Sequence, residues 1–399
     1  MEVNPGYKQT EVGVIPEEWD AIPLAGLCRS ICDGTHFTPK YVDSGIPFYS
    51  VENVTADDFT NTKFISAEEH ALLIKRCKPE RGDILMTRIT AGVLGDTRIL
   101  DWDVNASIYV SLALLKPNDR VLPEYLYRYS RSTAFVRGVE KRGLANATPK
   151  KINMRDIGAI PIPVPNTEDE QRAIASALSD VDGLLGGLDR LIAKKRDLKQ
   201  AAMQQLLTGQ IRLPGFHGEW EMKQLGDVVK ISKGQLITEG NAIPGAIPVI
   251  AGGKKPAYFH NKANRSGKTV TISASGASAG YVAFFDEPIF ASDCSTISES
   301  EDYSIEFVYF QLQLKQATIY KAQTGGAQPH IHAADVNPIE VFWPIVPVQT
   351  AIASVLMDMD AEVAALEQRR EKTRVLKHAM MQELLTGKTR LVPVGTAHV

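Results

Sequence analysis

Three short motifs in the second half of the chain have residue types that could do chemistry. Gly276-Ala277-Ser278-Ala279-Gly280 matches the G-x-S-x-G pattern, in which a serine nucleophile stands between a strand and a helix. The residues that follow it, YVAFF, have the composition of a strand, which favours a hairpin loop over a hydrolase site. Gly267-Lys268-Thr269 resembles the end of a phosphate-binding loop, but Lys262 occupies the position of that motif's first glycine. His330 and His332 could bind a metal, although a pair of loop histidines explains them as well.

We therefore expect no catalytic, cofactor-binding or metal-binding residue in this chain. A serine hydrolase that uses Ser278 stays open as an alternative function. Another alternative is a scaffold that binds only other proteins.

Positive charge is concentrated in two segments of the chain. Residues 137–155 contain six Lys or Arg and one Glu, and residues 223–268 contain eight Lys or Arg, one Asp and one Glu. Residues 286–306 contain no Lys or Arg, so the acidic balance lies elsewhere. Charge separated in this way can follow a phosphate backbone, although a solvated surface is the simpler alternative for either patch alone. Two patches at corresponding places in two repeated segments favour nucleic acid.

Base recognition requires hydrogen-bonding side chains at the tips of loops, where they can enter a groove. Tyr49 follows the apolar residues 46–48 and can equally be a core residue. The candidates for DNA contact are Thr35, His36, Lys40, Tyr49, Asn53, Arg88, Thr90, Arg142, Lys150 and Lys151 in the first half, and Lys233, Gln235, Lys254, Lys255, Tyr258, Ser273, Ser275, Ser278, Gln328 and His330 in the second.

The elements that must position these loops are organised around one stretch that appears twice. Residues 171–213 and 349–391 align without a gap at an offset of 178 residues. Apolar residues in both copies are spaced alternately four and three apart, which predicts two helices of about 40 residues. Gly209 and Gly387 stand where each helix would end in a left-handed residue. We expect the helices to pair antiparallel; two ordinary core helices are the alternative.

The segments between the helices also repeat. Glu18-Trp19 and Glu219-Trp220 are each followed by a leucine five residues after the tryptophan. The lead-in to the second tryptophan, Pro214-Gly215-Phe216, is matched at the other end of the chain by Pro5-Gly6-Tyr7. The repeat is therefore circular, and we expect the two chain ends to lie close together.

Composition gives broad limits on the class of protein. The chain has 399 residues and a formal charge of −3, and no apolar run is long enough to span a membrane. The four cysteines suggest no disulfide framework, which predicts a cytoplasmic protein.

Several stretches together resemble one known family. They are the lead-in GYKQTEVGVIPEEW, the DGTHFTP loop, the turns TPKKIN and AQPHIH, and the helix starts and ends EQRAIA/VQTAIA and LLTGQIRL/LLTGKTRL. These stretches are similar to the specificity subunit of type I restriction–modification systems, and the resemblance covers nearly the whole chain. It implies a non-catalytic subunit whose two globular domains each read one half of a bipartite, asymmetric target in double-stranded DNA. The paired helices would set the unread gap.

The resemblance also implies partners. Two methyltransferase subunits that use S-adenosylmethionine and two motor–nuclease subunits that use ATP and Mg would bind, with no cofactor held by this chain. Arg190, Lys194, Lys195 and Arg196 on the outward face of the first helix are candidates for methyltransferase docking.

The predicted fold is α+β, with two mixed target recognition domains separated by two long antiparallel coiled-coil helices in a pseudo-twofold circular repeat. The predicted boundaries are 1–165 and 211–345 for the recognition domains, 166–210 and 346–390 for the helices, and 391–399 for a tail.

Overall fold

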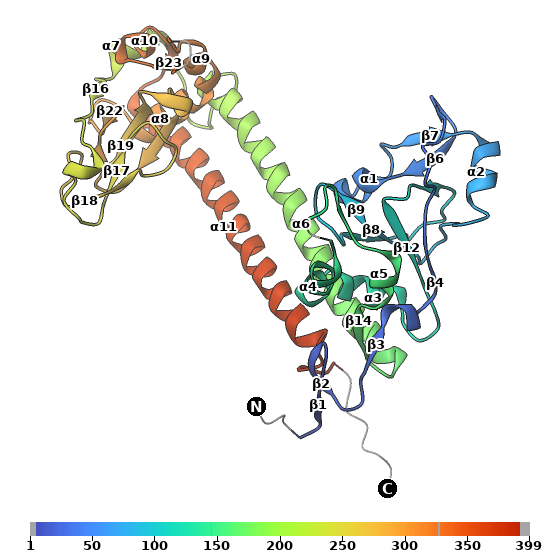
Figure 1. The fold of residues 1–399 in the computed structure, drawn as a ribbon. Coiled ribbons are helices and arrows are strands. Elements are labelled where there is room, and N and C mark those ends of the chain that lie inside the picture. Colours follow the sequence, from blue (N-terminus) through green and yellow to red (C-terminus); the bar gives the residue numbers. More distant parts are fainter. Residues whose placement is uncertain (1–4, 145, 326–327, 392–399) are drawn as a thin grey trace. The chain divides into compact units, whose positions relative to one another are not determined.

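The computed structural model describes residues 5–144, 146–325 and 328–391. The chain forms two compact units: unit 1 comprises the residues up to Gly187 and those from Arg370 onward, and unit 2 comprises Leu188–Arg369. Two long helices, α6 (Glu168–Leu207) and α11 (Val346–Leu384), each contribute one part to each unit (Figure 1). Apart from Leu391, the predicted tail lies outside the described residues. No helix among the described residues is both long and apolar enough to cross a membrane.

Unit 1 is built on two four-stranded sheets. The first is antiparallel and has the order β10-β8-β12-β4, and the second has the order β11-β6-β7-β5, in which β11 runs parallel to β6. The strands of these sheets are β4 (Cys28–Asp33), β5 (Tyr41–Val42), β6 (Ile46–Tyr49), β7 (Lys63–Ile65), β8 (Ile84–Thr87), β10 (Thr97–Ile99), β11 (Ser107–Ile108) and β12 (Leu112–Pro117).

Shorter elements complete unit 1. Strand pairs join β1 to β2, β3 to β14 and β9 to β13. These elements are β1 (Tyr7–Thr10), β2 (Gly13–Pro16), β3 (Asp20–Pro23), β9 (Ile89–Thr90), β13 (Lys150–Lys151) and β14 (Pro161–Val164), with helices η1 (Leu24–Gly26), α1 (Val51–Ala56), α2 (Ala67–Leu73), α3 (Pro123–Ser130), α4 (Thr133–Arg142) and α5 (Met154–Gly158).

Unit 2 repeats this topology. Its antiparallel sheet has the order β20-β19-β22-β16, and its second sheet, β18-β17-β21, again contains one parallel pair. The elements are β15 (Glu221–Gln224), β16 (Ser232–Lys233), β17 (Ile247–Ile250), β18 (Tyr258–His260), β19 (Thr269–Ser273), β20 (Val282–Phe285), β21 (Phe290–Ala291), β22 (Cys294–Ser298) and β23 (Glu340–Trp343), with helices α7 (Leu225–Val228), η2 (Glu239–Asn241), η3 (Gly276–Ser278), α8 (Ile305–Leu314), α9 (Gln316–Lys321) and α10 (Ala333–Val336).

The long helices pair antiparallel within each unit, as predicted. In unit 2, Lys195 pairs with Glu362 at 2.6 Å and Lys199 pairs with Asp360 at 2.5 Å, so residue numbers rise along α6 as they fall along α11. In unit 1, Leu178 packs in one apolar cluster with Leu384. The residues of the predicted apolar stripe are buried or half-buried along both helices. Burial of this apolar surface is what stabilises a pair of long helices.

The circular repeat is confirmed by matching contacts at the two helix ends. Gly209 ends α6 with a φ of 71° and packs against Trp220, and the Arg212 guanidinium lies 4.5 Å from the centre of that ring. Gly387 ends α11 with a φ of 69° and packs against Trp19, over which Arg390 lies. The second junction joins the two ends of the chain. It is closed by two N–H donors to the buried Glu170 carboxylate: the Trp19 indole nitrogen and the Arg390 guanidinium.

A buried glutamine fixes the start of each long helix in both units. In unit 1, the Gln171 amide accepts from the Leu122 backbone N–H at 2.7 Å and donates to the carbonyl of Pro165 at 3.0 Å. In unit 2, the Gln349 amide accepts from the Ser304 backbone N–H at 3.0 Å and donates to the carbonyl of Pro344 at 2.8 Å. Each unit therefore holds its own helix start by the same contacts.

Each unit has two consecutive short helices before its closing strand. They are α3 and α4 in unit 1 and α8 and α9 in unit 2. In unit 1 the break lies at Ser132, whose side chain accepts from the Phe135 backbone N–H and starts α4 as an N-cap.

Candidate nucleic-acid interface

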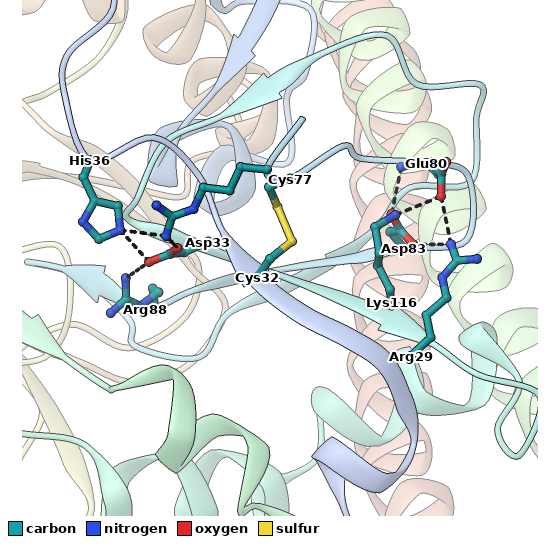
Figure 2. The surroundings of a disulfide bond; sticks show 10 residues. Arg29, Cys32, Asp33, His36, Cys77, Glu80, Asp83, Arg88 and Lys116 are labelled. Carbon is teal, nitrogen blue, oxygen red and sulfur yellow. Dashed lines mark hydrogen bonds and ion pairs between the residues drawn. A yellow bond between two sulfur atoms is a disulfide. The ribbon is translucent and has the colours of Figure 1, made fainter. Parts of the chain in front are cut away.

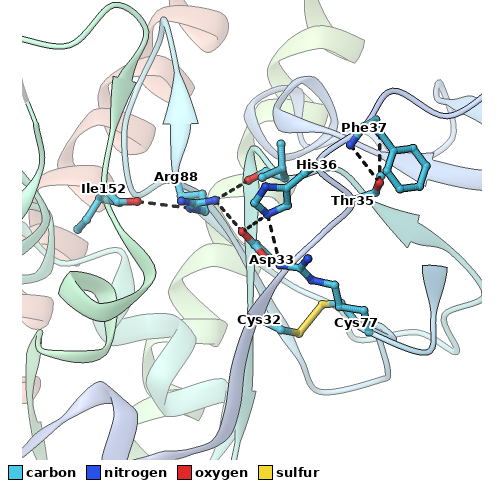
Figure 3. Close-up of polar contacts among 10 residues, drawn as sticks. Cys32, Asp33, Thr35, His36, Phe37, Cys77, Arg88 and Ile152 are labelled. Atoms are coloured by element: carbon cyan, nitrogen blue, oxygen red, sulfur yellow. Dashed lines mark hydrogen bonds and ion pairs between the residues drawn. A yellow bond between two sulfur atoms is a disulfide. The ribbon is translucent and has the colours of Figure 1, made fainter.

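In unit 1, the predicted loops meet at a buried carboxylate at the end of β4. Asp33 accepts a hydrogen bond from Arg88 at 2.9 Å and one from Arg76 at 2.5 Å, and the His36 ring lies 2.9 Å away (Figure 3). His36 belongs to the loop after β4, Arg88 follows β8, and Arg76 follows α2. One acidic side chain therefore ties three segments of unit 1 together.

Arg88 serves this internal network and is not free to reach a groove, so we withdraw it as a predicted DNA contact. Only 9% of the residue is exposed, and its guanidinium also donates to the backbone carbonyls of Val110 at 3.0 Å and Ile152 at 3.4 Å. Burial lowers the pKa of Arg88, while the negative charge of Asp33 raises it. A buried arginine with three partners is a structural residue.

The β9–β13 pair brings further predicted residues to the same place. Thr90 lies opposite Lys150, and Lys151 lies opposite Ile89. Both lysines are exposed, whereas Thr90 is buried and its hydroxyl accepts from the Gly92 backbone N–H. The lysines thus remain candidates for phosphate contact, and Thr90 shapes the loop.

The loop after β4 has a fixed backbone. A side chain at Gly34 would place its Cβ only 1.9 Å from the carbonyl oxygen of Ile108, so only glycine fits. The buried Thr35 hydroxyl accepts from the Phe37 backbone N–H at 3.3 Å and donates to the Phe37 carbonyl at 3.2 Å. His36, Phe37 and Lys40 are exposed on the outside of this loop.

Two other candidates of unit 1 belong to its interior. Tyr49 is a core residue, packed edge-on against Phe59 with ring centres 4.9 Å apart. Asn53 is buried and forms the start of α1, where its side chain accepts from Ser50 and donates to Asp58. We withdraw both from the set. Arg142, at the end of α4, is half-buried, and its guanidinium donates to the Gly138 carbonyl.

The expectation that no cysteines pair was wrong. Cys32 and Cys77 form a disulfide across 45 residues of sequence, next to Asp33 and Arg76 (Figure 2). It lies between the Asp33 cluster and a second ion cluster, in which the Lys116 ammonium is 2.6 Å from Asp83 and 2.9 Å from Glu80. Such a pairing could not be read from spacing alone, because four cysteines allow several connectivities.

In unit 2, the predicted loops also converge. Ser273, at the end of β19, donates its hydroxyl to the Gly252 carbonyl at 2.8 Å, and the Ser275 hydroxyl hydrogen-bonds to Asp293. Ser275 also forms a bridge with His330, the counterpart of the β9–β13 pair. Ser273 is buried, so it positions the loop of residues 252–255 and does not reach outward.

The exposed members of this second cluster are mainly basic or amide side chains. The Lys254 ammonium lies 5.3 Å from the centre of the Tyr281 ring, and the Tyr258 hydroxyl donates to the Ile237 carbonyl at 2.6 Å. The exposed candidates of unit 2 are Lys233, Gln235, Lys254, Lys255 and Gln328.

Two of the three motifs that could have done chemistry have a clear structural role. Gly276–Ser278 forms the three-residue 3-10 helix η3 in the connection between the antiparallel strands β19 and β20, so Ser278 is followed by a strand and not by the helix that a hydrolase site requires. The rings of His330 and His332 are stacked, with centres 6.4 Å apart. Within the described residues, no group of three or more His, Cys, Asp or Glu side chains is arranged to hold a metal.

The two clusters share a backbone but differ in side chains. At Gly234, as at Gly34, an added Cβ would lie only 2.2 Å from a carbonyl oxygen, here that of Ser292. The residues before these two glycines differ: the buried Asp33 precedes Gly34, and the exposed Lys233 precedes Gly234. Two equivalent loops thus present different hydrogen-bonding groups.

The candidate docking residues on α6 divide into two kinds. Arg190, Lys194 and Arg196 are exposed, although Arg196 also pairs with Glu367 on α11, whereas Lys195 is half-buried and pairs with Glu362. The prediction that all four face outward was therefore wrong for Lys195 alone, which pairs with α11 within unit 2.

The candidates chosen from the sequence lacked two residues of the unit 1 cluster, Asp33 and Arg76, because each acts through a partner distant in sequence. Arg76 is 43 residues from Asp33, and Asp33 is 55 residues from Arg88. The exposed aromatic Phe37 inside the DGTHFTP loop was the available signal.

Comparison with known proteins gives consistent matches. A family model described as type I restriction modification DNA specificity domain matches residues 16–192 and 217–376. A putative type I restriction enzyme specificity subunit of Methanocaldococcus jannaschii is 25% identical over 96% of this chain and 97% of its own length. A putative type I specificity subunit of Mycoplasma pneumoniae is 28% identical over 37% of this chain and 41% of its own.

Solved structures share the fold. The crystal structure of a type I restriction–modification S subunit from M. genitalium superposes with a TM-score of 0.66, at 16% identity over 96% of this chain and 98% of that one. A structure from work on assembly and conformational transition of the type I system has a TM-score of 0.58, at 16% identity over 94% of this chain and 99% of that one.

Proposed function

The chain belongs to the type I restriction–modification DNA specificity family, and from this premise we propose that its two units each read one half of a bipartite, asymmetric target in double-stranded DNA. One observation carries the proposal: both units present equivalent loops from the same sheet topology, but the residues on those loops differ. One backbone with two sets of reading side chains suits an address written in two unlike halves. In this proposal the paired helices set the unread gap.

The proposed contacts to DNA are the exposed polar and basic residues of the two clusters. In unit 1 they are His36, Lys40, Lys150 and Lys151, and in unit 2 they are Lys233, Gln235, Lys254, Lys255 and Gln328. Lysines on loops suit phosphate contact, whereas histidine and glutamine can also read base edges.

The subunit acts with partners. Specificity subunits are non-catalytic, so the chemistry belongs to other subunits: two methyltransferase subunits that use S-adenosylmethionine and two motor–nuclease subunits that use ATP and Mg. We place this assembly in the cytoplasm. The methyltransferase docks on the face of α6 that carries the exposed Arg190 and Lys194, where Leu191 and Leu198, seven residues apart, are also exposed.

Footprinting tests the proposal. The complex with its methyltransferase subunits should protect two short stretches of DNA separated by an unprotected gap, and a single continuous protected block would count against it. The double variant Lys254→Glu/Lys255→Glu distinguishes this proposal from a scaffold that does not touch DNA. This charge reversal should abolish protection of one stretch, and unchanged protection favours the scaffold.

A further inference from the structure

Unit 1 has an apolar cavity beside the Asp33 cluster. Its volume is about 320 Å³, and its apolar lining comes from Phe37 and Ile108 on one side and from Leu72 and Leu73 on the other. Phe37 is 62% exposed and Leu72 is 65% exposed. Large apolar side chains that flank a cavity and remain in water indicate a binding surface.

Both walls of the cavity are held in place. The first wall is the loop after β4, fixed by the tight approach of Gly34 to β11 and by the Thr35–Phe37 hydrogen bonds. The second wall is the end of α2 and the turn that follows it, and the Cys32–Cys77 disulfide joins this turn to β4 (Figure 3). The cavity is therefore preformed, which lowers the entropic cost of binding.

The rim of the cavity is basic. Arg76, whose side chain is 60% exposed, uses one nitrogen on Asp33 and leaves most of its donors toward solvent. His36 stands beside it, with 3.3 Å between the Arg76 Nη2 and His36 Nε2 atoms. Two carboxylates lie near this rim: the buried Asp33, which pairs with Arg76 and His36, and Glu69 on α2, which accepts from the Lys40 backbone N–H. An apolar cavity with a cationic rim matches a base edge next to a phosphate backbone.

We propose that this cavity receives the C5-methyl group of a thymine in the half-site read by unit 1, and that Arg76 donates to an acceptor of the neighbouring nucleotide. Thymine is the base that presents a methyl group in the major groove, where apolar side chains recognise it. This inference rests on the proposed function of the chain as a DNA reader. It makes Phe37, Leu72 and Arg76 specificity-determining residues.

The test uses the complex with its methyltransferase subunits and DNA that carries its mapped recognition sequence. Each thymine of the half-site read by unit 1, on either strand, is replaced singly by deoxyuridine, which lacks only the methyl group. One replacement should weaken binding about fourfold, because the complex loses the burial of one methyl-sized group, which is worth about 0.8 kcal/mol. In Leu72→Ala the difference between thymine and uracil at that position should fall below about twofold.

Two further variants complete the design. Phe37→Ala removes the other exposed wall and should act like Leu72→Ala, so the result does not depend on one variant. Val14→Ala, at an exposed valine of β2 in the same unit, should keep the fourfold difference.

The inference is overturned if no thymine replacement in that half-site weakens binding, if the half-site has no thymine, or if both wall variants keep the full difference. A complex that selects no sequence at all would instead overturn the proposed function.

Discussion

Replacing Asp33 with alanine should destabilise unit 1, because it leaves the buried Arg88 guanidinium without its counter-charge. Removing one partner of a buried ion pair costs about 3–5 kcal/mol. Arg88 keeps its hydrogen bonds to two backbone carbonyls, so we expect the lower end, about 3 kcal/mol. The exposed Arg76 adds little, since pairs of this kind contribute at most about 1 kcal/mol.

Hydrogen exchange followed by mass spectrometry is the suitable assay. Global unfolding of a chain with two compact units does not assign a free energy to one of them. Exchange of peptides from β4 and β8 reports the local opening of unit 1. A loss of about 3 kcal/mol makes the protected amides of these strands exchange roughly 150-fold faster. Peptides from β19 and β22 of unit 2 serve as the internal control.

Matched variants separate the buried pair from its surroundings. Arg76→Ala should change the exchange of β4 and β8 by less than about tenfold. Asp33→Ala combined with Arg88→Met should be more stable than Asp33→Ala alone, because no charge is then buried without a partner. A change below about 1 kcal/mol for Asp33→Ala, or a double variant as unstable as the sum of its parts, refutes the reasoning.

The remaining predictions concern other parts of the chain. Burial raises the pKa of the Cys28 and Cys294 thiols to about 12, so both should resist iodoacetamide at pH 8 until the protein unfolds. Reduction of the Cys32–Cys77 disulfide should add label in the folded protein, and peptide masses will show which cysteines are labelled. Burial alone would raise the pKa of Glu306, but the hydrogen bond from Lys268 helps to lower that pKa below its ordinary value of 4.5. That contribution is present above pH 4.5 and lost as the pH falls through the folded-state pKa, so the difference in Tm between the native chain and Glu306→Gln should shrink in acid; a constant difference would contradict this. Gly34→Ala should lower the stability of unit 1 by about 3 kcal/mol or more, whereas Gly183→Ala, with open space around it, should raise it by up to about 1 kcal/mol, and hydrogen exchange of unit 1 peptides measures both.

Much of the fold could be predicted from the sequence because its signals are local. The alternate spacing of Ile174, Leu178 and the apolar residues after them specifies a helix face, and Gly209 specifies where the helix stops. The circular repeat was visible because the Trp19 and Trp220 lead-ins are short and similar. Such features depend on neighbours within a few positions along the chain.

The site could be predicted only in part, because side-chain partners come from distant segments. The loops were identified from turn residues and charge, and the structure places several of their lysines at the surface. The roles of Arg88, Tyr49 and Asn53 could not be seen, since a polar side chain in a loop looks the same whether it faces water or a buried partner. The pairing of Lys195 with Glu362 was hidden for the same reason.

Mapping the recognised DNA sequence of a hybrid subunit tests the central claim most directly. Residues 1–165 are replaced by those of another member of the family, and the methylated sequence is determined by sequencing modified genomic DNA. The account predicts that one half of the target changes while the other half and the gap stay the same. A change in both halves, or in neither, would contradict it.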